Sequence, residues 1–218
     1  MIKFRKMQKI DLAGVKNIVF DLGGVIITLD HNEAIRRFKA AGVEDVEKYL
    51  DPYHQNGIFL DLEAGTMTKE EFYDALRKLT GKNISAEAID SGWLGFLKEV
   101  PIGKLKMLED LRTKDYTLYL LSNTNPVVMD WALTPAFSSE GKPLNTYFDK
   151  LYLSYQMKCV KPDEAIFHQM IADSGMIPAE TLFIDDGVHN IATAKRLGFK
   201  TYQPLNGEDF TERLLSNS

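Results

Sequence analysis

The first strong pattern in the chain is an apolar run at 18–20 that continues, after a short polar turn, at 25–27. Between the two halves stand Asp21 and the glycine pair Gly23 and Gly24. An apolar run of this kind is typical of a strand buried on both faces of a parallel sheet. The glycines allow a positive φ and a close approach of the backbone to a ligand. The pattern predicts a central strand that ends in a carboxylate at a ligand-binding edge, although an ordinary turn aspartate explains this stretch alone equally well.

Helical patterns alone fill the next part of the chain. Thr68 with Glu71 three residues later predicts a capping box, and glycines such as Gly42 end helical segments. No strand pattern stands between residues 30 and 99. This stretch of roughly seventy residues is too long for a βαβ crossover and large enough for a small domain. Helices are predicted at 34–41, at 43–50, within 54–63, at 68–79 and at 85–96.

From residue 100 onward, apolar strands alternate with amphipathic helices. This alternation predicts a parallel, doubly wound α/β sheet with right-handed crossovers. We therefore expect an α/β core domain at 17–30 and 100–218, an inserted helical cap domain at 31–99, and an N-terminal surface extension at 1–16. The later strands are predicted at 116–121, 151–154, 181–184 and 200–203. Helices are predicted at 102–113, from 125, from 161 (with Pro162 in its first turn) to 175, and at 189–198, with 134–145 as an exposed loop.

The composition is that of an ordinary globular protein with a mild excess of acidic residues. The net charge of -5 at pH 7 makes a broad basic surface for nucleic acid unexpected. The single cysteine, Cys159, excludes an intrachain disulfide and suits a reducing cytosol. No apolar stretch is long enough to span a membrane, and 1–16 lacks the apolar segment of a signal peptide. A cytoplasmic protein is expected, with no nucleic-acid or membrane partner and no obligatory protein partner.

Polar side chains follow four of the predicted strands. The carboxyl ends of parallel strands meet at one edge of a sheet, where open α/β sheets bind their ligands. We therefore expect these side chains to converge on one crevice, beside the point where the helical insert leaves the chain. They are Asp21, Ser122, Asn123, Lys161, Asp185 and Asp186.

This set of side chains predicts metal-assisted phosphoryl transfer. Three carboxylates so close cannot all stay ionised without a cation, because like charges raise one another's pKa. Carboxylate and backbone oxygens suit Mg²⁺, which also binds substrate phosphates. Lys161 adds positive charge, and Ser122 adds a donor for phosphate oxygens. Asp21 is then free to act as a nucleophile, since a carboxylate can form a phosphoenzyme.

Four strings of sequence stand at these strand ends in a fixed order. They read DLGGV at 21–25, LLSNTN at 120–125, KP at 161–162 and FIDDGVHN at 183–190. Each string alone is a weak signal, but all four in order at strand ends are specific. Together they resemble the four motifs of the haloacid dehalogenase (HAD)-like hydrolase superfamily. Within it, the chain is most similar to phosphatases of the α-glucose-1-phosphate type and to the N-terminal phosphatase domain of soluble epoxide hydrolases.

The resemblance implies a Mg²⁺-dependent phosphatase that acts on a small phosphorylated metabolite, with a sugar phosphate as the expected substrate. It also implies an aspartyl-phosphate intermediate on Asp21. Asp186 ranks above Asp185 as a direct metal ligand, with Asp185 as a neighbouring acid. The implied catalytic residues are Asp21, Lys161 and Ser122. The implied substrate contacts are Ser122, Asn123, Lys161 and Gly23, and the implied metal ligands are Asp21, the Gly23 carbonyl, Asp186 and Asp185.

One position departs from the superfamily's pattern. Most of its phosphatases carry a second Asp two residues after the nucleophile as general acid and base, and this chain has Gly23 there. A substrate with an acidic leaving group, such as an anomeric sugar hydroxyl, needs less protonation, and we favour this explanation. Alternatively, the acid comes from the cap, with His54 and Glu63 as candidates, or the site is catalytically weak.

Three other functions stay open on the sequence alone. A phosphomutase or a dehalogenase uses the same scaffold, although the superfamily's dehalogenases do not need the metal that the acidic pair at 185–186 implies. A binding or regulatory protein is the third, with Gly23 marking lost catalysis. Trp93 and Trp131 are expected to pack hydrophobic surface rather than to bind sugar.

Overall fold

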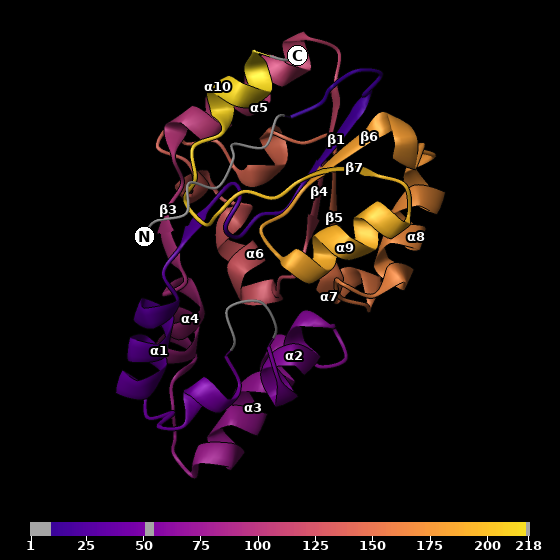
Figure 1. The fold of residues 1–218 in the computed structure, drawn as a ribbon. Coiled ribbons are helices and arrows are strands. Elements are labelled where there is room, and N and C mark those ends of the chain that lie inside the picture. The colour runs from indigo at the N-terminus through magenta and orange to yellow at the C-terminus, as the bar shows by residue number, and fades with distance from the viewer. Residues whose placement is uncertain (1–9, 51–54, 217–218) are drawn as a thin grey trace, which may run out of the picture.

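The computed structural model describes residues 10–50 and 55–216, in which a sheet with flanking helices adjoins a separate helical unit (Figure 1). The sheet has five strands: β1 (Asn17–Phe20), β4 (Thr117–Ser122), β5 (Lys150–Leu153), β6 (Thr181–Ile184) and β7 (Lys200–Tyr202). All neighbouring pairs are parallel, in the order β5-β4-β1-β6-β7. At the end of the central strand, Phe20 is opposite Leu120 of β4 and Ile184 of β6. The predicted parallel α/β sheet is confirmed.

Helices cover both faces of the sheet. They are α5 (Ile102–Thr113), α6 (Pro126–Ala132), α7 (Ser154–Met157), α8 (Glu164–Ser174), α9 (Val188–Arg196) and α10 (Thr211–Leu215). Alternate residues of β1 point to opposite faces, so Ile18 and Phe20 share a hydrophobic cluster with α5, α6 and α10, whereas Val19 packs with α8 and α9. Because both faces are covered, the central strands are apolar at nearly every position, which explains the continuous runs in the sequence.

Four helices between the first and second strands of the main sheet form the helical unit, which has its own hydrophobic cluster. They are α1 (His31–Ala40), α2 (Gly57–Glu63), α3 (Lys69–Thr80) and α4 (Ala86–Leu94). Phe59 lies at the centre of the cluster, with its ring centroid 5.2 Å from that of Phe38, 5.0 Å from Phe72 and 5.4 Å from Trp93. The helical insert is therefore present, while its exact domain boundaries stay a prediction.

Helix ends in this unit follow the local sequence. Thr68 and Glu71 form the predicted capping box at the start of α3, and Gly81 ends that helix with a φ of 66°. The segment 43–50, predicted as a helix, contains only the 3₁₀ helix η1 (Val46–Lys48). His54 lies outside the described residues.

A short antiparallel pair of strands lies where the chain enters and leaves the helical unit. β2 (Thr28–Leu29) pairs with β3 (Leu97–Glu99), so the prediction of no strand between 30 and 99 is wrong at its end. A three-residue strand with one apolar residue, Leu97, carries no repeating pattern. Its partner is distant in the sequence, so the pairing has no local signal.

The segment 134–145 is not simply the exposed loop that we predicted. It contains the 3₁₀ helix η2 (Pro135–Phe137) and leads into η3 (Leu144–Thr146). Phe137 and Leu144 are buried in the cluster on the α5 side of the sheet. Prolines and serines in this segment mark turns correctly, but the isolated apolar residues between them anchor it to the core.

One helix start differs from the prediction, and two short helices were not predicted. Pro162 precedes α8 instead of standing in its first turn, because Asp163 is the N-cap and its side chain accepts a hydrogen bond from the Ala165 N–H. The helices α7 and α10 were not predicted, because four or five residues are too few to show a helical period. A further 3₁₀ helix, η4 (Pro178–Glu180), leads into β6.

Residues 10–16 differ from the expected surface extension. Ile10, Leu12 and Val15 are buried in the hydrophobic cluster that also contains α5. This part of the N-terminal segment therefore belongs to the core of the sheet part. Residues 1–9 lie outside the described residues.

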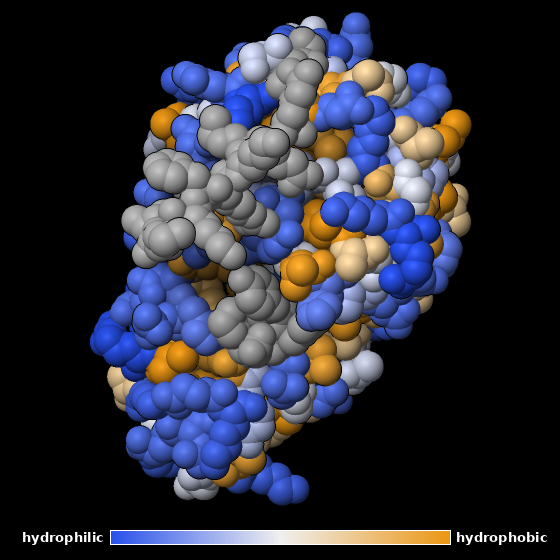
Figure 2. Space-filling view, viewed as in Figure 1, coloured by the Kyte–Doolittle hydropathy of each residue, from blue (hydrophilic) through white to orange (hydrophobic). Residues whose placement is uncertain are grey.

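The residues drawn in colour on the face in Figure 2 are mostly hydrophilic, with hydrophobic residues in small groups. Isolated exposed apolar residues of this kind are normal. Within residues 10–50 and 55–216, no helix has the length and hydrophobicity needed to cross a membrane. The large exposed apolar side chains in the described part are Leu79, Ile102, Leu133, Ile177, Val188 and Leu205.

Replacing Phe59 tests the core of the helical unit. Phe59→Ala is expected to lower the free energy of unfolding by about 3–5 kcal/mol, because it leaves a cavity among the rings of Phe38, Phe72 and Trp93. Urea unfolding followed by circular dichroism measures the change. Leu79→Ala, at a side chain that is 50% exposed, is the control and should change stability by about 0.5 kcal/mol or less. Equal stability of the two variants would contradict the central place of Phe59.

Candidate active site

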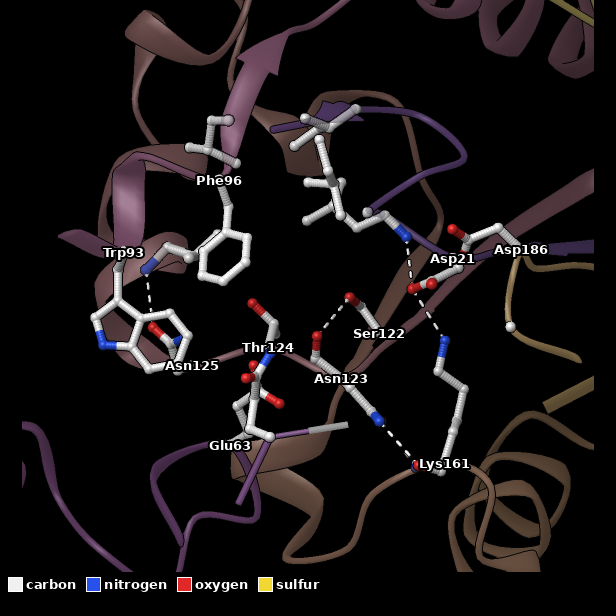
Figure 3. Close-up of a pocket in the computed structure, with 18 of the residues that line it drawn as sticks. Asp21, Glu63, Trp93, Phe96, Ser122, Asn123, Thr124, Asn125, Lys161 and Asp186 are labelled. Carbon is white, nitrogen blue, oxygen red and sulfur yellow. Dashed lines mark hydrogen bonds and ion pairs between the residues drawn. The ribbon is translucent and has the colours of Figure 1, made fainter. Parts of the chain in front are cut away.

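The carboxyl ends of β1, β4 and β6 and the loop after β5 border one pocket between the sheet and the helical unit (Figure 3). Parallel strands bring these ends to one edge, as the sequence predicted. Asp185 lies beside the pocket, fully buried. The predicted site residues that line the pocket are Asp21, Gly23, Ser122, Asn123, Lys161 and Asp186.

Asp21 extends the central strand by one residue, because its backbone N–H donates to the carbonyl of Ile184 at 2.9 Å. Oδ1 of its carboxylate accepts a hydrogen bond from the Leu22 N–H at 2.7 Å and lies 2.9 Å from Nζ of Lys161. Among the described residues, Oδ2 has no hydrogen-bond partner. The carboxylate is thus held in one orientation, with its second oxygen left for a ligand.

Lys161 uses all three protons of its ammonium group inside the site. Nζ donates to Oδ1 of Asp21 at 2.9 Å, to Oδ2 of Asp185 at 2.7 Å and to the carbonyl of Leu121 at 2.8 Å. The side chain is only 1% exposed. Burial alone lowers the pKa of a lysine, but Asp185 and Asp21 outweigh burial and raise the pKa of Lys161 above its ordinary value. Lys161 is therefore a fixed positive charge.

The backbone of Lys161 is clamped by Asn123. Nδ2 of Asn123 donates to the carbonyl of Lys161 at 2.9 Å, and Oδ1 accepts from its N–H at 2.8 Å. Both ends of this amide bond the backbone of Lys161, so the side chain of Asn123 positions that lysine. The amide keeps a second N–H, and the substrate contact that we expected of Asn123 stays a prediction.

Ser122, the last residue of β4, lies between Asp21 and Asn123 in the pocket (Figure 3). Its Oγ makes one long hydrogen bond, 3.3 Å, to the carbonyl of Asn123. The next helix does not need this hydroxyl as a cap, because Oδ1 of Asn125 accepts from the Val128 N–H at 3.2 Å. The Ser122 hydroxyl can therefore turn to a ligand oxygen at little cost.

The two neighbouring acids after β6 have different surroundings. Oδ1 of Asp185 accepts from the Gly187 N–H at 2.8 Å and from Nδ2 of Asn190 at 2.9 Å, while Oδ2 accepts from Lys161. Asp185 is thus fully buried, and both of its oxygens already accept hydrogen bonds. Asp186 lines the pocket, and no other described residue donates a hydrogen bond to its carboxylate. The geometry supports our ranking of Asp186 above Asp185 as a ligand.

Gly24 makes room for the Asp186 carboxylate beside Asp21. Its φ is 74°, and a Cβ placed on it would lie 2.2 Å from Oδ2 of Asp186. Asp21, Asp185 and Asp186 each offer an oxygen, and these atoms lie within 4.8 Å of one another. A glycine in this turn is therefore required for the three acids to meet.

The crowded carboxylates hold protons more tightly than usual. Burial and the nearby Asp185 raise the pKa of Asp21 to about 6, although Lys161 opposes the shift. Burial, Asp21 and Asp185 raise the pKa of Asp186 to about 7. The cluster therefore carries an excess of negative charge that protons or a cation must balance.

Gly23 supplies no side chain to act as general acid and base, but the space beside it is filled. A Cβ placed on Gly23 would lie 3.0 Å from Cδ1 of Leu29. The Leu29 side chain fills the space beside the turn, where an acid at position 23 would otherwise stand. The missing side chain is therefore part of a packed arrangement and not an open hole.

The helical unit supplies the opposite wall of the pocket. Glu63 from α2, Trp93 from α4 and Phe96 line it (Figure 3). Trp93 packs in the aromatic cluster as predicted, yet its Nε1 is buried and has no hydrogen-bond partner among the described residues. Of these three residues only Glu63 was a candidate from the sequence, since helical periodicity identifies core faces but not which core edge borders a cavity.

The family model of the haloacid dehalogenase-like hydrolases matches residues 15–198. The chain belongs to this family. A D-ribitol-5-phosphate phosphatase from Bacteroides thetaiotaomicron is 52% identical over 200 residues, which cover 92% of this chain and 97% of that protein. The membership confirms the resemblance found at the four strings of sequence.

Solved structures of HAD-like hydrolases share the whole fold. A predicted HAD-like family hydrolase from Porphyromonas gingivalis is 52% identical with a TM-score of 0.89, over 93% of this chain and 97% of that one. An HAD family enzyme from Bacteroides thetaiotaomicron, a mutant solved in complex with magnesium and inorganic phosphate, is 41% identical with a TM-score of 0.87, over 92% and 98%. The sheet and the helical unit described above therefore recur together in this hydrolase family.

Removing the buried lysine tests the charge balance of the site. Lys161→Met is expected to lower the free energy of unfolding by about 3–5 kcal/mol in chelator, because Asp21 and Asp185 lose their shared counter-charge. Adding Asp185→Asn to it should restore part of the loss. Chemical unfolding of both single variants and the double variant measures the coupling.

Lys195→Met removes an exposed lysine of α9 and is the matched control for Lys161→Met. It should shift stability by about 0.5 kcal/mol or less. Additive effects of Lys161→Met and Asp185→Asn would show that the two side chains are not energetically paired.

Proposed function

We propose that this chain is a Mg²⁺-dependent phosphatase that hydrolyses a small phosphorylated sugar or polyol through an aspartyl-phosphate on Asp21. The observation that carries the proposal is the oriented Asp21 carboxylate, with Lys161 on one side and Asp186 on the other in one pocket. A carboxylate held this way is a nucleophile aimed at a phosphoryl group. Lys161 stabilises the charge that develops on the transferring oxygens.

The donor set of the pocket fits Mg²⁺. The carboxylates of Asp21 and Asp186 and the carbonyl of Gly23 would hold the ion, and hard oxygen ligands of this kind are the ones that Mg²⁺ prefers. Asp185 would support the set through Lys161, since both of its oxygens already accept hydrogen bonds. When bound, the ion supplies Lewis-acid stabilisation of phosphoryl oxygens. The related enzyme solved with magnesium and inorganic phosphate supports this choice.

The proposed reaction has two steps. Asp21, whose carboxylate Lys161 and the Leu22 N–H hold, attacks phosphorus, and the bond from phosphorus to the alcohol oxygen breaks so that the alcohol leaves. Ser122 donates to a phosphoryl oxygen once it releases its long bond to the Asn123 carbonyl. Water then hydrolyses the acyl phosphate and regenerates Asp21.

D-Ribitol 5-phosphate is the first substrate to test, because the 52% identical relative is named for that activity. The pocket suits a flexible polyol chain: polar groups from Asn190 and Glu63 border it, and Trp93 and Phe96 supply apolar surface. Sugar 1-phosphates, the class that we expected from the sequence, are the comparison set.

Asp21→Asn is expected to abolish phosphate release, by about 10⁴-fold or more, while the fold is kept. The nucleophile is lost, but the amide still accepts the Leu22 N–H and leaves less buried charge. Free phosphate is measured with D-ribitol 5-phosphate and sugar 1-phosphates, with Mg²⁺ and with EDTA. Full activity of Asp21→Asn refutes the mechanism. Phosphate release that EDTA does not lower refutes the Mg²⁺ requirement, and isomerised sugar phosphate in place of free phosphate points to a mutase.

Gly24→Ala is expected to raise the Mg²⁺ concentration needed for half-maximal activity by about 10–100-fold, because its Cβ displaces Asp186. Activity against a Mg²⁺ titration measures the effect. Gly81→Ala is the matched control, since Gly81 has a similar φ of 66° and a Cβ placed on it would meet no atom within 4 Å. An equal Mg²⁺ requirement in the two variants would leave Asp186 without a part in metal binding.

A further inference from the structure

Glu63 is the one acid of the helical unit, among the described residues, that reaches the pocket. It is the last residue of α2, it is 8% exposed, and it lines the pocket together with Asp21 and Ser122 (Figure 3). No described lysine, arginine or histidine forms an ion pair with its carboxyl group. A buried carboxyl without a counter-charge is costly unless it is protonated or bonded to a ligand. Hydrophobic packing therefore does not explain why a carboxyl group is buried at position 63.

The backbone around Glu63 is fixed to the sheet part. The hydroxyl of Ser154, at the start of α7, donates to the carbonyl of Glu63 at 2.6 Å. Two residues on, Gly65 packs so closely on α7 that a Cβ there would lie 1.9 Å from the carbonyl oxygen of Tyr155. Nζ of Lys158 donates to the carbonyl of Gly65. These contacts hold the end of α2 over the carboxyl edge of the sheet. The backbone of Glu63 is therefore fixed relative to the pocket.

The protonation of Glu63 suits a proton donor. Burial, and after it the negative charge of Asp21, raise the pKa of Glu63 to about 8, although Lys161 opposes the shift. The carboxyl group therefore carries a proton at neutral pH. In the turn after Asp21, Leu29 occupies the space beside Gly23, so no acid stands there.

We propose, on the basis of the phosphatase function above, that Glu63 is the general acid and base of the reaction, supplied by the helical unit in place of a side chain at position 23. As Oδ of Asp21 bonds to phosphorus, the bond from phosphorus to the alcohol oxygen breaks, and the Glu63 proton moves to that oxygen. Glu63, now a carboxylate, takes a proton from the water that attacks phosphorus. The bond from phosphorus to Asp21 then breaks, inorganic phosphate leaves, and both acids return to their starting states.

The test compares two leaving groups in the Mg²⁺-loaded enzyme. The alcohol of D-ribitol 5-phosphate needs a proton to leave, whereas the nitrophenolate of p-nitrophenyl phosphate does not. Glu63→Gln should lower kcat/KM for D-ribitol 5-phosphate by ~10²–10⁴-fold and for p-nitrophenyl phosphate by about threefold or less. A retained kcat/KM on the aryl ester also shows that the variant is folded.

Glu70→Gln is the matched control, because Glu70 is an exposed glutamate of the same helical unit. It should change neither rate. Equal losses of kcat/KM on both substrates in Glu63→Gln would overturn the proposal, because a general positioning defect does not discriminate leaving groups. A raised KM for D-ribitol 5-phosphate at unchanged kcat would also overturn it, since Glu63 would then only bind a hydroxyl.

The same measurements separate this proposal from the phosphatase function on which it rests. Asp21→Asn should lose both substrates, because the nucleophile serves any leaving group. If Asp21→Asn keeps the aryl activity, the proposed function itself fails. If Asp21→Asn loses both activities and Glu63→Gln spares neither, the phosphatase function stands and the role of Glu63 falls.

Discussion

One buried lysine supplies the positive charge that lets the acids of this site lie close together. Lys161 forms ion pairs with Asp21 and Asp185, and Asp186 stands within 4.8 Å of both acids. With every group ionised, three carboxylates and one ammonium leave two negative charges, which burial makes costly. The same cost raises the pKa values of Asp21 and Asp186, since a proton bound to either acid removes part of this excess. A divalent cation offsets it without protonating the nucleophile, so the charge excess is itself the source of metal affinity.

The rest of the sheet part serves this charge balance through backbone geometry. The strand order places β1 between β4 and β6, so the ends that carry Asp21, Ser122 and Asp185 are neighbours. The left-handed turn at Gly24 lets Asp186 approach, and the Asn123 clamp fixes where the lysine chain begins. The strand order, the turn and the clamp all act by fixing where the charged groups lie. Moving any of the charged groups by an ångström would change the balance, because Coulomb energies at these distances vary steeply.

Much of this arrangement follows from the sequence, and the failures have physical reasons. Parallel strands must bring their carboxyl ends together, so the convergence of Asp21 with the pair Asp185 and Asp186 was predictable. The two acids were ranked as metal ligands only by resemblance. Their different surroundings depend on which backbone and side-chain donors reach each carboxylate, and those donors come from distant parts of the chain. The Asn123 clamp had no signal, because a hydrogen bond to a distant backbone leaves no periodicity. The buried turns in 134–145 were missed for the same reason: isolated apolar residues carry no pattern.

The helical unit and the sheet part each supply one reacting group, so the reaction depends on the contact between them. The nucleophile belongs to the sheet, while the acid that we assign, Glu63, reaches the pocket only when the end of α2 lies on α7. Their contact includes a buried hydrogen bond from Ser154 and a surface ion pair from Lys69 to Asp130 at 2.7 Å. A surface pair adds little stability. Val127 of α6 adds an apolar contact, because it is buried in the cluster of the helical unit. Together these contacts hold Glu63 at the pocket while the alcohol leaves and while water attacks the phosphorus bound to Asp21.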